Sequence, residues 1–195
     1  DPQNMINGIV RAPLIPLGNE RIDRRHAHSV ALAAFFRDAW LRDAMLWRKV
    51  GDFFSPESGQ PSAIALLARY LDPVPAGVIA SLESVLPPSV QKSIGVATGE
   101  WAEYLLDHLK NVQAEVQQEI TYFEEARRLA FEENKNSLVA QIGRVLETLR
   151  KRDLLGFLGS RNVLPKYGFP VDVVDLRTTN SDNSISALLG ASPGA

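Results

Sequence analysis

Residues 98–152, TGEWAEYLLDHLKNVQAEVQQEITYFEEARRLAFEENKNSLVAQIGRVLETLRKR, decide the fold of this chain. In the first part of this stretch apolar residues recur every three or four positions, which is the spacing of one helix face. They are Trp101, Leu105, Leu109, Val112, Val116, Ile120 and Phe123. No Pro and no Gly interrupt residues 100–133, so we predict one helix about 50 Å long, with Thr98 as its N-terminal cap.

A second amphipathic helix is predicted at residues 137–152, after a turn at 133–136. Its apolar positions follow the same spacing. They are Leu138, Ile142, Val145, Leu146 and Leu149. Residues 154–158 are also apolar and are expected to extend this helix.

The charges of the two predicted helices are opposite. Residues 100–133 hold nine acidic and three basic side chains, whereas residues 134–167 hold seven basic and two acidic ones. Amphipathic neighbours of opposite charge that are joined by a short turn are typical of a helical hairpin. We therefore predict that residues 98–133 and 137–152 pair as antiparallel helices.

The rest of the chain is also predicted to be mainly helical. Helices are expected at residues 20 to about 47, 62–71, 76–86 and 89–94, with a loop at 51–61. The fold class is thus mainly α, a helical bundle with a long hairpin. The predicted organisation is an extended lead-in at residues 1–18, a single helical domain at 19–177 with one short β-branched strand near 171–176, and a flexible tail at 178–195.

Composition excludes several classes of protein. Of 195 residues, 45% are hydrophobic, which is too many for a disordered chain, and none is Cys, which excludes disulfides, thiolate metal sites and a cysteine nucleophile. The longest apolar run, residues 30–36, is too short to cross a membrane, so no membrane association is expected. The absence of Cys favours a cytoplasmic location.

Catalytic motifs are missing from the sequence. It contains no Gly-rich phosphate loop ending in Lys-Ser or Lys-Thr, no DEAD-type box, no Gly-x-Ser-x-Gly and no His-Glu-x-x-His. Without a cradle of glycine amides and a lysine, nucleotide phosphates have no recognisable site. We predict no catalytic, cofactor-binding or metal-binding residue in this segment and do not expect it to hydrolyse ATP alone.

A first basic cluster lies at the start of the first predicted helix. Its members are Arg21, Arg24, Arg25, His26 and His28. They fall within about two helical turns and could contact a phosphate backbone, although a solvated face or ion pairs with Glu20 and Asp23 explain them equally well. His26 and His28 point about 200° apart on a helix and cannot share a metal ion.

His26 has two interpretations. It could act as a proton carrier or phosphate contact at the centre of a small enzyme. Alternatively, its ring is buried and one ring nitrogen bonds to a neighbouring loop, and this structural interpretation is favoured.

A second basic strip follows the predicted hairpin. It consists of Arg144, Arg150, Lys151, Arg152, Arg161 and Lys166, and it is followed by Tyr167 and Phe169. Positive charge beside aromatic rings is typical of surfaces that bind single-stranded nucleic acid. The alternative, that these bases pair with the acidic helix, has equal weight.

Both ends of the sequence resemble one protein family. LPKYGFPVDVVDLR at 164–177, after DLLGFL at 153–158, is similar to a segment of large bacterial superfamily 2 helicases of the DEAD/DEAH-box type that carry a C-terminal four-cysteine metal-binding domain. LGNERIDRRH at 17–26, with SVALA at 29–33, resembles the stretch after the second RecA-like lobe of these helicases. The central residues 51–136 add little to the resemblance.

The resemblance implies a noncatalytic helical connector between the motor and the C-terminal domain of an ATP-dependent DNA helicase or translocase in DNA repair or phage defence. Its partners would be those two domains in cis and single-stranded DNA. The resemblance implies ATP and Mg for the motor and Zn for the cysteine domain, with no cofactor here. A start at Asp1 without Met fits the expectation of a middle piece.

The alternative is a stand-alone helical module whose long acidic helix docks a protein partner. DNA and RNA are not distinguished by these residues.

Overall fold

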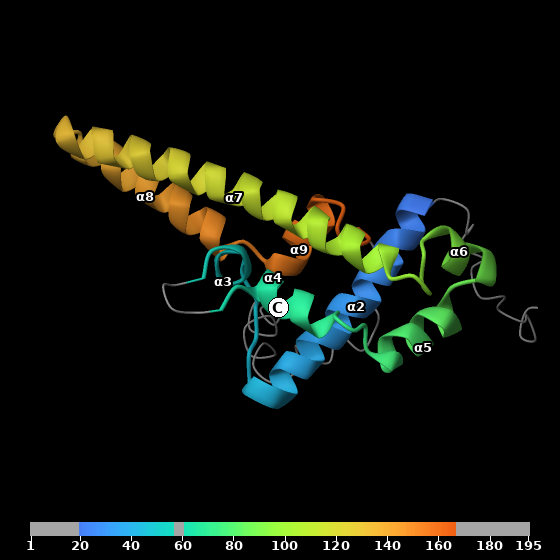
Figure 1. Ribbon diagram of the computed structural model, residues 1–195. Helices are drawn as coiled ribbons and strands as arrows, with labels where there is room; N and C mark the ends of the chain where they lie inside the picture. The colour runs from blue at the N-terminus through green and yellow to red at the C-terminus, as the bar shows by residue number, and fades with distance from the viewer. Residues whose placement is uncertain (1–19, 57–60, 167–195) are drawn as a thin grey trace, which may run out of the picture.

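The computed structural model describes residues 20–56 and 61–166. These residues form eight helices, which confirms the predicted mainly α fold (Figure 1). The helices are α2 (Glu20–Asp43), α3 (Val50–Phe54), α4 (Ala63–Tyr70), α5 (Ala76–Val85), α6 (Pro88–Ser93), α7 (Glu100–Glu132), α8 (Asn136–Lys151) and α9 (Leu154–Ser160). The predicted lead-in at 1–18, strand near 171–176 and tail at 178–195 lie outside the described residues.

The predicted hairpin is present. Helices α7 and α8 lie side by side and form an arm that extends away from the other helices (Figure 1). The turn at its tip works because Asn134 adopts a left-handed conformation with φ of 57°. The amide of Lys135 can then donate to the carbonyl of Ala130 at 2.9 Å, which closes the end of α7.

Apolar contacts hold the arm together more than charge does. Ile142, Leu146 and Leu149 of α8 are buried, and each such side chain contributes about 1.5–3 kcal/mol. The ion pair between Arg150 and Glu124, at 2.7 Å, joins α8 to α7 but is exposed to solvent. Exposed ion pairs contribute less than about 1 kcal/mol.

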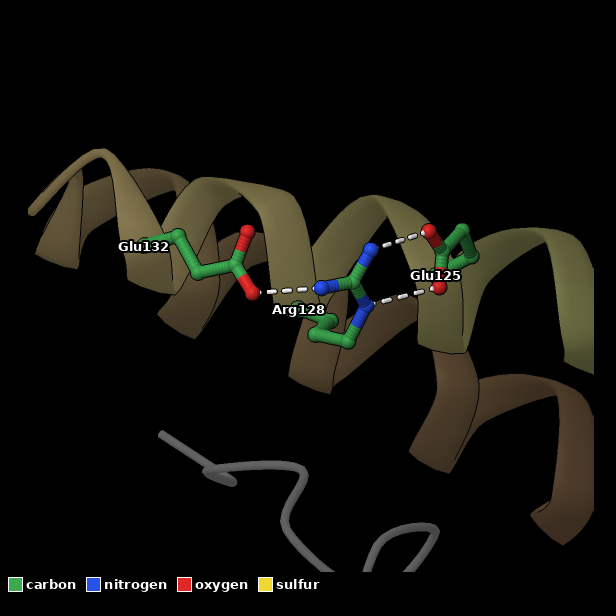
Figure 2. Close-up of polar contacts among 3 residues, drawn as sticks. All are labelled: Glu125, Arg128 and Glu132. Atoms are coloured by element: carbon green, nitrogen blue, oxygen red, sulfur yellow. Dashed lines mark hydrogen bonds and ion pairs between the residues drawn. The ribbon is translucent and has the colours of Figure 1, made fainter.

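Three acidic residues of α7, Asp107, Glu125 and Glu132, pair within their own helix. Arg128 lies between Glu125 and Glu132, three residues before it and four after it (Figure 2). The hydrogen bond from Arg128 lowers the pKa of Glu125. The acidic excess of this helix is therefore partly an intrahelical ladder on a solvated face.

The prediction of a loop at residues 51–61 is wrong for the first residues of this range. Residues 50–54 form α3, because Val50, Phe53 and Phe54 are all fully buried and their spacing of three and four residues suits a helical turn. The rings of Phe53 and Phe54 contact each other edge to face at 4.9 Å.

Helix α2 ends earlier than predicted. Ala44 has φ of 52°, so the helix ends at Asp43 rather than near Trp47. Trp47 then folds back and stacks on Phe35, with ring centroids 5.2 Å apart. The indole of Trp47 is thus covered by this stacking, whereas the sequence pattern predicted that it packs as part of a continuous helix.

The predicted cap of α7 is also wrong. Gly99, with φ of 83°, precedes the first helical residue, and the Thr98 hydroxyl instead donates to the carbonyl of Gly95 at 3.2 Å. A glycine occupies this place because φ is positive there.

Residues 154–158 do not extend α8. The chain turns at Arg152, and Asp153 starts the separate helix α9 by accepting a hydrogen bond from the Gly156 amide at 2.8 Å. The sequence signal for this break was the aspartate, which is a favoured N-terminal cap.

The base of the arm is attached to the other helices by polar contacts. The amide of Val50 donates to the carbonyl of Arg152 at 3.0 Å, and the amide of Leu154 donates to the carbonyl of Arg48 at 2.9 Å. These two bonds form a short antiparallel bridge. On the other side of α3, the side-chain amide of Gln117 donates to the carbonyl of Phe54 at 2.8 Å. Both helices of the arm are therefore fixed to α3.

Gly51 marks the closest approach of α3 and α8. A Cβ atom at this position would lie 3.1 Å from both the Cβ and the carbonyl oxygen of Arg150. We expect Gly51→Ala to lower the free energy of unfolding by about 1–3 kcal/mol, because helix α8 cannot move away without breaking the bridge. Urea denaturation followed by circular dichroism measures this change.

Gly143→Ala is the matched control. This glycine lies within α8 with nothing within 4 Å of a Cβ, so its replacement should raise stability by about 0.5–1 kcal/mol. Equal effects of the two substitutions would contradict the close approach.

Candidate nucleic-acid interface

A hollow of about 460 Å³ lies where α2, α7 and the turn after α9 meet. Arg21, Arg24 and Arg25 line it from α2, and Arg161 lines it from the turn after α9. The structure therefore brings together members of the two basic clusters that the sequence placed far apart.

Helical periodicity explains why α2 contributes several residues to this hollow. Arg21, Arg25 and His28 are separated by four and then three residues, so they share one face of the helix, and Arg24 lies beside them. Helix α7 contributes Tyr104 and His108, which are four residues apart.

Arg24 is fixed in place by two neighbours. Its guanidinium forms an ion pair with Glu20 and lies over the ring of Tyr104, 4.6 Å from the ring centroid. A cation above an aromatic face contributes about 0.5–1 kcal/mol at an exposed site. The Nε atom of Arg24 is buried and has no hydrogen-bond partner within the described part of the chain.

His28 forms the wall between the hollow and the core. Its side chain is 1% exposed, and its Nδ1 donates to the carbonyl of Val163 at 3.0 Å. Burial lowers the pKa of His28 to about 4, against the opposing effect of that hydrogen bond, so the ring is neutral near pH 7. Its second nitrogen, Nε2, is then an acceptor, and it has no partner among residues 20–56 and 61–166.

His108 has a similar environment. Burial lowers its pKa, and a hydrogen bond to the backbone of Arg161 opposes this shift. Its Nδ1 is buried and also lacks a partner in the described ranges. The rings of His28 and His108 both contact Tyr104, at centroid distances of 5.9 and 6.0 Å.

Arg161 is held by a residue of α7. Its guanidinium pairs with Glu115 at 2.6 Å and lies 5.1 Å from the ring centroid of Phe157. The next residue, Asn162, has φ of 60° and ends α9 by donating to the carbonyl of Gly159 at 3.1 Å. This turn places Val163 next to His28.

His26 lies apart from this hollow. It is half-buried and lines a second hollow of about 610 Å³, between α2 and α5, that holds apolar side chains such as Val30 and Ala34. The predicted divergence of His26 and His28 is therefore confirmed. The buried, loop-bonded role that we predicted for His26 belongs instead to His28, because the face of α2 that carries His28 is covered by α7 and by the segment after α9.

The second basic strip is divided between paired and unpaired residues. Arg150 pairs with Glu124 and Arg161 pairs with Glu115, both of the acidic helix α7, as the ion-pair interpretation predicted. Lys151 instead pairs with Glu147 of its own helix, at 2.5 Å. Three other members are exposed and form no ion pair with any described residue. They are Arg144, Arg152 and Lys166. Tyr167 lies outside the described residues.

Sequence reasoning missed three residues of the hollow, Tyr104, His108 and Asn162. The available signal was the spacing of Tyr104 and His108, which follow the apolar positions Trp101 and Leu105 by three residues each. That spacing places them beside the buried stripe, but it does not say which helix covers them.

Comparison with known proteins gives no family for this chain. No family model, no curated protein and no solved structure matches it. Among the described residues, no helix combines the length and apolar character needed to cross a membrane. The same residues contain no group of three or more His, Asp or Glu side chains that could hold a metal ion.

The neutral state of His28 predicts a pH-dependent stability. The pKa is 6.5 for a solvent-exposed histidine and about 4 for His28 in the fold, so the unfolded chain binds the proton more tightly. The stabilising contribution is therefore complete above about pH 6.5 and is lost as the pH falls toward 4, by about 3 kcal/mol in all. Urea denaturation across this range measures the loss.

His28→Asn isolates this contribution. Asparagine retains a short side-chain donor for the carbonyl of Val163 but does not titrate. We expect the variant to lose clearly less stability between pH 7 and pH 4 than the wild type does. Parallel pH profiles for the two proteins would show that His28 is not the responsible group.

Proposed function

We propose that this chain is a noncatalytic helical connector of an ATP-dependent DNA helicase or translocase, and that it contacts nucleic acid through the hollow at the start of α2. The observation that carries the proposal is the convergence of Arg21, Arg24 and Arg25 with Arg161 around one hollow. The family and its role in DNA repair or phage defence rest on the sequence resemblance, and a cytoplasmic location rests on the absence of Cys from the sequence.

Charge and geometry support a phosphate contact. Arg25 lines the hollow, is half-buried and forms no ion pair with a described residue. Its guanidinium is therefore available to bind an anion that enters the hollow. Arginine suits this task because its planar group can bind a phosphate through two parallel hydrogen bonds. The ring of Tyr104 lies under the guanidinium of Arg24 and contacts the ring of His108, which holds this one arginine in place.

The arm supports a coupling role. Helix α7 lines the hollow at its N-terminal end and reaches the tip of the arm at its C-terminal end, without an interior Gly or Pro. A packed helix of this kind resists bending, so it can carry a small rotation from one end to the other. The motor and the C-terminal domain in cis would be the two bodies it connects, with ATP and Mg held by the motor and Zn by the cysteine domain.

A second candidate function is a protein-interaction module. It is favoured by exposed apolar side chains toward the tip of the arm, where Tyr122 is 69% exposed and Phe131 is 68% exposed. Surfaces of this kind are typical of helices that dock a partner.

Binding of single-stranded DNA tests the first candidate. We expect the double variant Arg21→Ala/Arg25→Ala to bind an oligothymidylate at least tenfold more weakly than the wild type. Its plot of log affinity against log salt should become shallower by about 1.4, because two phosphate contacts are lost. Fluorescence anisotropy at several salt concentrations measures both quantities.

The control is Arg144→Ala/Arg152→Ala, which removes two exposed cations from the strip and no ion pair among described residues. It should bind almost as the wild type does. If this control loses the affinity and the first variant retains it, the strip rather than the hollow is the interface. If the wild type itself does not bind, the interaction module becomes the better proposal.

A break in α7 tests the coupling role. Gln118 is exposed in the middle of α7, so Gln118→Pro should bend the arm without removing a core side chain, whereas Gln118→Ala should leave it straight. In the full-length protein we expect the proline variant to retain ATP turnover and to lose most strand separation. Equal unwinding by the two variants would count against a lever.

A further inference from the structure

The hollow contains an unusual concentration of unpartnered polar atoms. Within the described residues, five buried side-chain N or O atoms have no hydrogen-bond partner, and three of them belong to Arg24, His28 and His108 of this hollow. A buried polar atom without a partner destabilises the fold, and proteins hold few of them. Their concentration at one place indicates that a ligand with polar atoms belongs there.

The charge around these atoms selects an anion. The wall of the hollow holds four arginines and one carboxylate, that of Glu20. Glu115, which pairs with Arg161, reduces this positive excess but does not remove it. In such a field a doubly charged anion gains about twice the energy of a singly charged one.

The histidines of the hollow narrow the choice of anion further. At neutral pH the Nε2 of His28 is a hydrogen-bond acceptor, because its Nδ1 donates to Val163. A phosphate monoester has a second pKa near 6, so near neutral pH it exchanges between a dianion, which carries two charges and no proton, and a monoanion, which keeps one P–OH group. An internal phosphodiester carries one charge and has no P–OH group. The dianion of the monoester gains more from the arginines than a diester does, and its monoanion can donate a hydrogen bond to the neutral imidazole.

The size of the hollow fits more than the phosphate itself. About 460 Å³ falls within the range of small-molecule sites and leaves room for the sugar that carries the phosphate. The edges of Tyr104 and His108 would lie along that sugar, since both line the same hollow.

We propose that this hollow binds a phosphate monoester, either the terminal phosphate of a nucleic-acid strand or that of a free nucleotide. The arginines Arg21, Arg25 and Arg161 hold the charged oxygens, and the Nε2 atom of His28 accepts a hydrogen bond from the P–OH group of the monoanion. Only the assignment of the ligand to the end of a strand rests on the proposed nucleic-acid contact.

The test compares the same oligothymidylate with a 5′-phosphate, with a 3′-phosphate and with neither, together with thymidine monophosphate as a competitor. We expect the strand phosphorylated at one of its ends to bind about tenfold more tightly than the unphosphorylated strand, or thymidine monophosphate to bind about tenfold more tightly than the nucleoside. Arg25→Ala should remove this difference, and Arg25→Lys should restore part of it. His28→Asn should reduce this difference.

Arg144→Ala is the matched control, since it removes an exposed cation from α8 outside the hollow. If the phosphate raises affinity only in the strands, the ligand is the end of a strand. If it also raises affinity in thymidine monophosphate, the ligand is a free nucleotide. If phosphorylation changes no affinity, the monoester site is wrong, while binding of the unphosphorylated strand would still support the proposed function. A gain that Arg25→Ala leaves intact would also overturn it.

Discussion

The burial of the apolar stripe of α7 is the constraint on which the rest of this structure depends. The first part of the stripe, with Trp101, Leu105 and Leu109, is buried where α7 meets the other helices, and the later part, with Val116 and Ile120, is buried along the arm. One uninterrupted helix therefore belongs both to the arm and to the group of helices from which the arm extends. Because its side chains are fixed at both ends, the helix cannot rotate or shift in register without exposing part of the stripe to water.

The hollow lies at one end of this helix, where three elements from distant parts of the sequence meet. His28 of α2 contacts both Tyr104 of α7 and Val163 after α9, and these contacts bury the imidazole that separates the hollow from the core. A buried neutral histidine is costly to protonate. The same packing that stabilises the fold thus leaves a buried nitrogen without a partner among the described residues, and several arginines, around one hollow. Arginines gathered in this way suit an anion.

Much of the fold could be predicted from the sequence because its helices are long and strongly periodic. The bounds of α7 and α8 differ from the prediction by one or two residues, and the hairpin charge pattern is realised in pairs such as Arg150 with Glu124. The errors fall where burial decides the local structure. Residues 50–54 look like a loop beside glycine and proline, yet Phe53 and Phe54 fold into a helical turn because both rings fill the core.

The sequence by itself determined the helical class, the long hairpin and the two basic clusters, since each depends on residues that are near one another along the chain. Only the tertiary structure decided that Arg161 joins Arg21 and Arg25, that His28 rather than His26 is buried, and that Arg150 is paired. The physical reason is that periodicity defines which face of a helix is apolar but not which helix covers it. The crossing of α2 over α7, set by the packing of the whole core, makes that choice and thereby forms the hollow.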